Sequence, residues 1–353
     1  MENLNEIQQS TLEQLPFGNY QHNLSDIPPT ASDIGHLWTG YMAETMSVCM
    51  LKHITEQTKD PDIKPILQQA LDLSTERVKS MENLYTSIHH PIPIGFGEKD
   101  VDASAPGLFS EAFGLIYTRL MSLYVVEHYL LALTRSPRSD FRQIYLNAIT
   151  SSSNLIEKTT NVLLAKGLLP KSPIIVVPDQ LKLVDDKNYY GSIFGGKRTL
   201  NAVEISHLYH CIVIKMVFST LNLGFAQVTK SKDIKKYFER GKQIDSEHTK
   251  ILGSILQEEN LTIPMPGEFQ VSDSKHSPYS EKLMLFHSTV VTSYSTLSDA
   301  FALTSSARKD LVTAFSRLSI ESLEYAKHGA DLLIENNWLE RIPETVNRKE
   351  LIH

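Results

Sequence analysis

Histidines and carboxylates in the second half of the chain are the residues best placed to do chemistry. Asp245 and His248 lie three residues apart in a stretch whose apolar spacing predicts a helix with both side chains facing inward. Ferritin-like metal centres use a carboxylate and a histidine at this spacing, because it presents both ligands to one interior point of a helix bundle. Such a set could hold iron, manganese or zinc. The candidate ligands are His207, His210, Asp245, His248, His287 and Glu324.

The first two of these histidines lie on a long apolar helix that the sequence predicts over residues 199–228. Thr199 or Asn201 can cap this helix, and Glu204 stands three residues after Asn201, where the carboxylate of a capping box belongs. Steps of three and four residues place both histidines on the same stripe as apolar residues. A second apolar line follows the opposite side. We therefore expect this helix to be buried on two faces, between two packed units.

Composition excludes several classes of function. The chain has 353 residues and a net charge of -7 at pH 7, whereas nucleic-acid binding needs a basic surface. Its two cysteines, Cys49 and Cys211, cannot form a disulfide framework and fit a reducing compartment. The first residues have neither the basic start nor the apolar centre of a secretory signal. We therefore expect a cytoplasmic protein that does not bind nucleic acid.

One stretch, residues 211–228, is apolar enough to suggest a membrane span. It contains Lys215, Asn222 and Gln227. It is also barely long enough, since a spanning helix needs about 20 apolar residues. The sequence therefore predicts a buried helix and no membrane span.

Helix start and stop signals divide the chain into five parts. Thr30 and Asp33 can form a capping box for a first helix of about 27 residues. Gly167 lies where a fourth helix would end. The predicted parts are a flexible N-terminal arm (1–29), a first four-helix bundle (30–170), an interdomain connection (171–198), a second four-helix bundle (199–343) and a C-terminal tail (344–353).

The second half of the chain repeats the first. A shift of 171 residues superposes DIGHLW, which begins at Asp33, on EISHLY, which begins at Glu204. The same shift aligns the Ile-Pro dipeptides that begin at Ile92 and Ile263, and a shift of 170 continues the match near the C-terminus. A register held over so long a span predicts a tandem duplication of one unit.

In each repeat the sequence predicts four helices of about 25 to 30 residues. Each would be about 40 Å long at about 1.5 Å per residue. The fold class is therefore all-α, a tandem duplication of a ferritin-like four-helix bundle. The first and second helices, and the third and fourth, are joined by a few residues and must be antiparallel. About 17 residues separate the second helix from the third, and they could reach about 55 Å when extended. Both a ferritin-like crossover and a simple up-down path are allowed.

The first repeat lacks the histidine that makes the second one interesting. Arg77 stands where the second repeat has His248. It falls on inward stripes together with Glu44 and Glu127, which predicts a buried ion pair. Because an arginine would repel a metal ion, we expect any metal site to belong to the second repeat alone.

Four stretches carry a resemblance to a known family: NAVEISHLYH, GFAQVTKSKDIKKYFERGK, SPYSEKLMLFH and AKHGADLLIENNWLERIP. Together they resemble an uncharacterised family of spore-forming Firmicutes built from two ferritin-like bundles. The resemblance covers both halves, from about residue 30 to residue 343. It implies the fold and the lineage, and the family has no established activity to carry over. Some related proteins are associated with the spore coat, so the resemblance also implies a link to sporulation.

Three hypotheses for function remain open. The first is a non-catalytic structural or binding protein, linked to sporulation or the spore coat, with protein partners that the sequence does not name. The second is a metal-binding ferritin-like protein or metal-dependent oxidoreductase, with His210, Asp245, His248 and a carboxylate of the last helix as ligands. The third is a carrier that holds a ligand between the bundles, in a closed apolar pocket lined by the His207 stripe.

Overall fold

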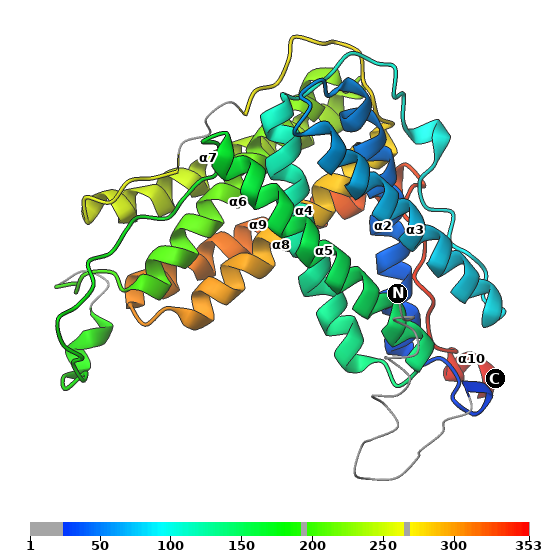
Figure 1. Cartoon of the computed structure of the whole chain (residues 1–353). Coiled ribbons are helices and arrows are strands. Elements are labelled where there is room, and N and C mark those ends of the chain that lie inside the picture. The colour runs from blue at the N-terminus through cyan, green and yellow to red at the C-terminus, as the bar shows by residue number, and fades with distance from the viewer. Residues whose placement is uncertain (1–23, 192–195, 265–268, 353) are drawn as a thin grey trace, which may run out of the picture.

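The chain folds into helices that form two crossing groups. The computed structural model describes residues 24–191, 196–264 and 269–352. Within these ranges there are nine α-helices, α2 to α10, and no β-strand, which confirms the all-α fold. Figure 1 shows that α2–α5 and α6–α9 form the two groups, while the connection from α5 to α6 runs outside both. The predicted flexible arm falls mostly on residues 1–23, which lie outside the described residues.

The helices of the first bundle begin at residues that the sequence signals. Thr30 Oγ1 accepts a hydrogen bond from the Asp33 N–H, and Asp33 Oδ2 accepts one from the Thr30 N–H at 2.8 Å. This confirms the predicted capping box. Asp60 and Pro61 predict that the second helix begins at Pro61, but it begins at Lys64, because the Asp60 carboxylate closes a separate turn before it. The helices are α2 (Ala31–Gln57), α3 (Lys64–Ser87), α4 (Glu111–Arg135) and α5 (Ser139–Ala165).

Three of the four helices of the second bundle have the same length as their counterparts in the first, and α7 is three residues longer than α3. α2 and α6 have 27 residues each, α4 and α8 have 25, and α5 and α9 have 27, which agrees with a tandem duplication. The predicted capping box of α6 is also present, with the Asn201 N–H donating to Glu204 Oε2 at 3.0 Å. The remaining elements are α6 (Ala202–Val228), α7 (Lys232–Glu258), α8 (Glu281–Ser305), α9 (Lys309–Glu335), α10 (Arg348–Ile352) and the 3-10 turns η1 (Leu24–Asp26), η2 (Glu98–Asp100) and η3 (Lys187–Tyr190).

Contacts between α6 and α8 decide the path of the chain. Lys215 contacts Asp299, whereas Asn222, further along α6, contacts Ser288, which comes earlier in α8. Rising residue numbers on α6 thus face falling numbers on α8, so these helices are antiparallel. α7 is also antiparallel to α6, because only residues 229–231 join them. α7 and α8 are therefore parallel, and the connection between them crosses the length of the bundle.

The first bundle takes the same path. Ser136, after the end of α4, donates a hydrogen bond to Asp33 in the first turn of α2, and Tyr129 donates one to Glu44 in the middle of α2. α2 and α4 are thus antiparallel, and the connection from α3 to α4 also crosses its bundle. Of the two paths that the sequence allowed, both bundles follow the ferritin-like crossover.

The two crossover connections pair with each other. Val101 forms an isolated antiparallel bridge with Tyr279, and Phe109 forms one with Val271. In the repeat register of 170 residues, Val101 corresponds to Val271 and Phe109 to Tyr279. The two bridges are therefore the same contact seen from either bundle. Such reciprocity is what a two-fold interface between identical units produces.

Aromatic residues mark the axis of this pseudo-two-fold interface. Tyr117 of α4 and its counterpart His287 of α8 contact each other, with 2.9 Å between Tyr117 Oη and His287 Nε2. Tyr124 and its counterpart Tyr294 have ring centroids 5.3 Å apart. Equivalent residues touch where an axis passes between them, so α4 and α8 cross at the axis. One apolar core extends from the first bundle into the second.

α6 is the core helix of the second bundle. Among the described helices it alone is long and apolar enough to cross a membrane, and 72% of that apolar window is buried within the protein. Leu208 and Ile212 belong to a core cluster inside the second bundle, while Val217 and Leu221 belong to the cluster that both bundles share. This arrangement agrees with the predicted burial of α6 between packed units.

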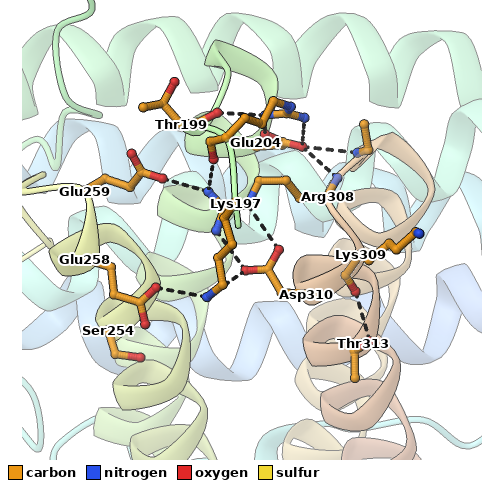
Figure 2. A network of polar contacts seen from close by, with 12 residues as sticks. Lys197, Thr199, Glu204, Ser254, Glu258, Glu259, Arg308, Lys309, Asp310 and Thr313 are labelled. Atoms are coloured by element: carbon orange, nitrogen blue, oxygen red, sulfur yellow. Dashed lines mark hydrogen bonds and ion pairs between the residues drawn. The ribbon is translucent and has the colours of Figure 1, made fainter. Parts of the chain in front are cut away.

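A network of charges fixes the start of the second bundle (Figure 2). Arg308, just before α9, donates to the carbonyl oxygen of Arg198 at 2.9 Å and pairs with Glu259 at 2.7 Å. In the first bundle its counterpart Arg138 donates to the carbonyl oxygen of Ile27 at 2.7 Å. Both bundles thus use an equivalent arginine to hold the chain that leads into their first helix.

Cleavage of the connection between α5 and α6 should leave the two bundles together. Ile174 in this connection is 98% exposed, so a recognition site for a specific protease inserted beside it should be cut readily. Because the bundles share one core, we expect the cut protein to elute from size-exclusion chromatography at the volume of the intact chain. Elution as two separate halves would contradict the shared core.

Gly224 offers a matched test of the same interface. A Cβ atom at this position would lie 2.5 Å from the Phe109 ring of the first bundle, so Gly224→Ala should make the cut halves separate more readily. In Gly253→Ala the new Cβ would meet Ile263 at an ordinary 3.5 Å, and the halves should stay together. Equal elution of both cut variants would show that Phe109 does not pack against α6.

Candidate functional site

A buried ion pair occupies the centre of the second bundle. Lys215 lies midway along α6, and its Nζ is 2.8 Å from Asp299 Oδ2 and 3.0 Å from Ser295 Oγ, both on α8. The side chains of Lys215 and Asp299 are 1% and 0% exposed. Burial is the largest effect on Lys215 and lowers its pKa, but Asp299, Cys211 and Asp245 together outweigh burial, so the pKa of the lysine is raised. Lys215 is therefore an ammonium ion inside the bundle.

The predicted ligand Asp245 lies beside this pair. Part of the residue is accessible, but its carboxylate lies among buried groups, where burial raises its pKa to about 7 and the charge of Lys215 opposes the rise. Its Oδ2 accepts a long hydrogen bond, 3.4 Å, from Asn222 Nδ2, and Asn222 Oδ1 accepts one from Ser288 Oγ at 3.0 Å. The charged form of Asp245, like that of Asp299, is thus stabilised by Lys215.

His248, the other predicted ligand of α7, is fully buried. Its Nε2 is 3.1 Å from Glu321 Oε2 of α9. Burial lowers the pKa of His248, Lys215 lowers it further and Glu321 opposes them, so the imidazole is neutral at pH 7. When the Nε2–H group donates a hydrogen bond to the Glu321 carboxylate, Nδ1 carries no proton and has a free lone pair. This Nδ1 is buried and has no hydrogen-bond partner in the part of the chain that the structure describes.

His287 does not join this cluster, because it lies on the pseudo-two-fold axis. Burial lowers its pKa to about 3, so the ring is neutral and its Nε2 can accept the hydrogen bond from Tyr117. Burial also raises the pKa of Tyr117, which keeps the phenol protonated as a donor. This histidine therefore serves the contact between the bundles.

His210 lies too far along α6 to meet His248. Ser219 of α6 is 3.1 Å from Ser246 of α7, and this register places His210 about two helical turns, or about 11 Å, from the level of His248. The short connection predicted between these antiparallel helices leads us to expect His210 within about one turn of His248, and the observed register corrects this expectation. The cause is the extended backbone of residues 229–231, which displaces α7 along the bundle relative to α6.

The last two predicted ligands lie away from the centre. His207 is half-buried one turn before His210, and Glu324 is exposed on α9. Glu321 contacts His248, whereas Glu324, one turn further along α9, is exposed and makes no contact with this cluster of described residues. The six predicted ligands are not brought to one point. In the described ranges no group of three histidine, cysteine, aspartate or glutamate side chains is placed to hold a metal ion.

A metal centre does not fit the second bundle as it is folded. Its two carboxylates, Asp245 and Asp299, already share a cation, the ammonium of Lys215. A divalent ion beside this ammonium would be repelled, by the same argument that applies to Arg77 in the first repeat. A centre of iron, manganese or zinc remains a prediction from the sequence. The side chains in the middle of the second bundle do not support it.

The first bundle has an ion pair at the same level. Arg77 Nη1 is 3.1 Å from Glu44 Oε1, and Arg77 Nη2 donates to Ser152 Oγ at 2.7 Å. Tyr129 donates to Glu44 Oε1 at 3.1 Å. The predicted pair of Arg77 and Glu44 is confirmed. Glu127 does not take part in it: this residue is half-buried elsewhere on α4, where burial raises its pKa.

Two central residues, Lys215 and Asp299, are absent from the set that the sequence predicts. In the repeat registers of 171 and 170 residues, Lys215 corresponds to Glu44 and Asp299 to Tyr129. A lysine in the middle of an apolar helix is itself a signal, because a buried ammonium needs a buried acid. At the position that Lys215 and Glu44 share, the repeats thus exchange a base for an acid. Their partners lie at different positions, because Arg77 corresponds to His248.

The hypothesis of a carried ligand requires a closed apolar pocket lined by the His207 stripe. The cavity at the boundary between the bundles lies instead beside Glu44, Tyr117, His128 and Val290. Its volume is about 30 Å³, which is room for a single water molecule. This cavity does not support ligand carriage.

Asp245→Asn should stabilise the protein at pH 8. The pKa of Asp245 in the folded protein, about 7, lies above its ordinary value of 3.8. The unfolded chain therefore releases this proton first, and wild-type stability falls as the pH rises from 4 to 7. The variant lacks this loss, so its free energy of unfolding at pH 8 should exceed that of wild type, by at most about 4 kcal/mol at about 1.4 kcal/mol per unit of pKa shift. The difference should shrink towards pH 4.

Urea unfolding at several pH values measures this effect. Asp233→Asn, on the same helix, is the matched control, because the Asp233 side chain is 78% exposed. The control should change stability little at any pH. A difference between Asp245→Asn and wild type that does not depend on pH would show that Asp245 ionises normally.

Comparison with known proteins agrees with the repeat. No curated protein matches the chain. A solved structure from Bacillus halodurans, named "putative spore coat protein", is 16% identical to this chain, with a TM-score of 0.39; the match covers 44% of this chain and 100% of that one. The sequence profile of a family described as protein of unknown function (DUF3231) matches residues 21–181 and again residues 189–351. This chain therefore belongs to the DUF3231 family, with two copies of its domain in tandem.

Proposed function

We propose that this chain is a non-catalytic structural protein that acts through its surface. The observation that supports this proposal is the bonding of the reactive side chains at the bundle centres. Lys215 is bound to Asp299, and His248 to Glu321. These contacts join the helices of the second bundle, and the charge of Lys215 is matched by Asp299 inside the protein.

The connection between α5 and α6 is the surface that we propose for binding. Its residues 173–184 have no regular secondary structure, with a bend at Asp179 and Gln180, and they are highly exposed although the segment is apolar: Ile174 is 98% exposed, Val176 93% and Leu181 99%. β-branched residues favour strand pairing. Exposed strands with unpaired backbone groups bind other strands by adding to their edge. We define residues 173–184 as the docking strand.

A second copy of this chain is the partner that we propose. The docking strand carries Lys182 and Asp179, so two copies in antiparallel order can place each lysine opposite the aspartate of the other. The same register places Val177 opposite Val184. Cross-strand pairs of opposite charge and of β-branched residues stabilise strand pairing. Repeated contacts of this kind would let a structural protein assemble.

Sedimentation velocity on the full chain tests this proposal. Wild type should self-associate with rising concentration, and the variant Ile174→Ser/Val176→Ser/Leu181→Ser should stay monomeric. The control Ile320→Ser/Leu323→Ser removes exposed apolar side chains of α9, which are 60% and 57% exposed, and should associate as wild type does. The proposed surface would be refuted by a wild type that is monomeric throughout, or by equal association of all three proteins.

A place in sporulation also belongs to this proposal. The resemblance of the four sequence stretches to a family of spore-forming bacteria supports it. A fluorescent fusion expressed in a sporulating host should collect at the spore surface. A fusion that stays evenly distributed in the mother cell would count against a role in the coat.

A further inference from the structure

We infer that the centre of the second bundle is a cation site that the protein fills with its own Lys215, and that removing this lysine opens the site to a divalent transition-metal ion. The inference does not depend on the proposed self-association. It starts from the side chains that surround the ammonium. Asp299 approaches from α8, and Asp245 and His248 approach from α7.

Two buried atoms in this cluster have unused lone pairs. Asp299 Oδ1 and His248 Nδ1 are buried and lack a hydrogen-bond partner among the described residues. Asp299 and His248 are both 0% exposed. An unbonded acceptor in the interior is costly unless a cation or a donor is near. Lys215 contacts Asp299 directly and its charge also acts on His248, while the Cys211 thiol interacts with the Asp299 carboxylate as well.

Glu321 fixes His248 in the tautomer whose free nitrogen, Nδ1, can bind a cation. The carboxylate holds Nε2 at 3.1 Å, which fixes the tautomer with its lone pair on Nδ1. Histidines that bind metals are commonly oriented in this way, because a carboxylate on one ring nitrogen makes the other more basic. The centre therefore offers two carboxylates and one oriented imidazole to a single positive charge. Divalent transition metals bind such sets of oxygen and nitrogen donors.

The first bundle also has a basic side chain paired with an acid at its centre, but these residues come from other positions. There the cation is Arg77 on the second helix, and its acid is Glu44, at the position that corresponds to Lys215. Both bundles therefore keep one basic side chain at the centre, although on different helices. Two independent solutions at the same level indicate that the bundle centre must hold a cation. In neither bundle does the protein leave that place to a metal.

The distances explain why wild type should not bind metal. The ammonium of Lys215 keeps Asp299 at 2.8 Å, and the described residues contain no group of three ligands close enough to hold an ion. Lys215→Ala removes the charge and most of the side-chain volume. The two carboxylates then repel each other, and a divalent ion with bound water can occupy the space. Binding requires Asp245, Asp299 and His248 to turn towards the vacated space, because among the described residues no three such side chains stand together as ligands.

Cobalt(II) binding by the full chain tests this inference. Equilibrium dialysis followed by elemental analysis should show about one additional cobalt per chain in Lys215→Ala relative to wild type, with visible absorption bands typical of nitrogen and oxygen ligands. Cobalt should also raise the melting temperature of Lys215→Ala and leave that of wild type unchanged, because an ion that binds only the folded state stabilises it.

Two further variants serve as controls. Lys215→Met removes the charge but fills the space, and it should bind no additional cobalt. Lys215→Ala/Asp299→Asn keeps the space but weakens one ligand, and it should lose most of the gain. Should Lys215→Ala be unfolded in chelator, we expect cobalt to restore its helical circular dichroism and its melting transition. Lys215→His, which adds a ligand, should show the same rescue.

Three results would overturn the inference. One is a folded Lys215→Ala that binds no more cobalt than wild type. Another is unfolded Lys215→Ala and Lys215→His proteins that cobalt does not restore. The third is a wild type that binds one metal ion and loses it in Asp299→Asn, because the cluster would then hold metal despite its lysine.

Discussion

The Lys215–Asp299 ion pair is the contact on which the second bundle depends. Both side chains are withdrawn from water, and removing one partner of such a buried pair typically costs about 3 to 5 kcal/mol. Around it, α6, α7 and α8 each contribute a polar group, and Glu321 of α9 extends the set through His248. The charges therefore fix the register of all four helices. A purely apolar core would permit more than one register.

The pseudo-two-fold interface is the second constraint. The reciprocal bridges of the crossover connections and the contact of Tyr117 with His287 give the chain the geometry of a dimer of identical units. Residues on the axis have to suit both sides at once, and this requirement explains why a histidine at position 287 faces the other bundle. The same interface gives the ferritin-like crossover a role, because the long connections supply the paired segments.

Periodicity and capping signals were enough to predict the helices, the duplication and the ion pair of the first bundle. They work because these features depend on local spacing, as Thr30 with Asp33 and Arg77 with Glu44 show. The path between the second and third helices could not be predicted, since a long connection is compatible with either course. That choice is made by contacts between helices that are distant in sequence.

The candidate site was harder to predict than the fold. Helical spacing predicted which side chains face inward, and Asp245 and His248 do lie near the centre. It did not give the axial shift between α6 and α7, which separates His210 from His248. Lys215 was not among the predicted site residues, because a charged lysine is not a metal ligand. The repeat register of the sequence already aligns Lys215 with Glu44. What it could not give are their partners, Asp299 and Arg77, which only the folded chain brings into contact.

The protonation state of Lys215 is the most direct test of the claim that the protein supplies its own cation. Nitrogen-15 NMR of the lysine side chains, assigned with Lys215→Met, can follow this group from pH 6 to pH 9. We predict an ammonium signal in slow exchange with solvent that persists over the whole range and does not change with chelator. A signal of a neutral amine near pH 7, or one that appears only after chelator is added, would contradict the account.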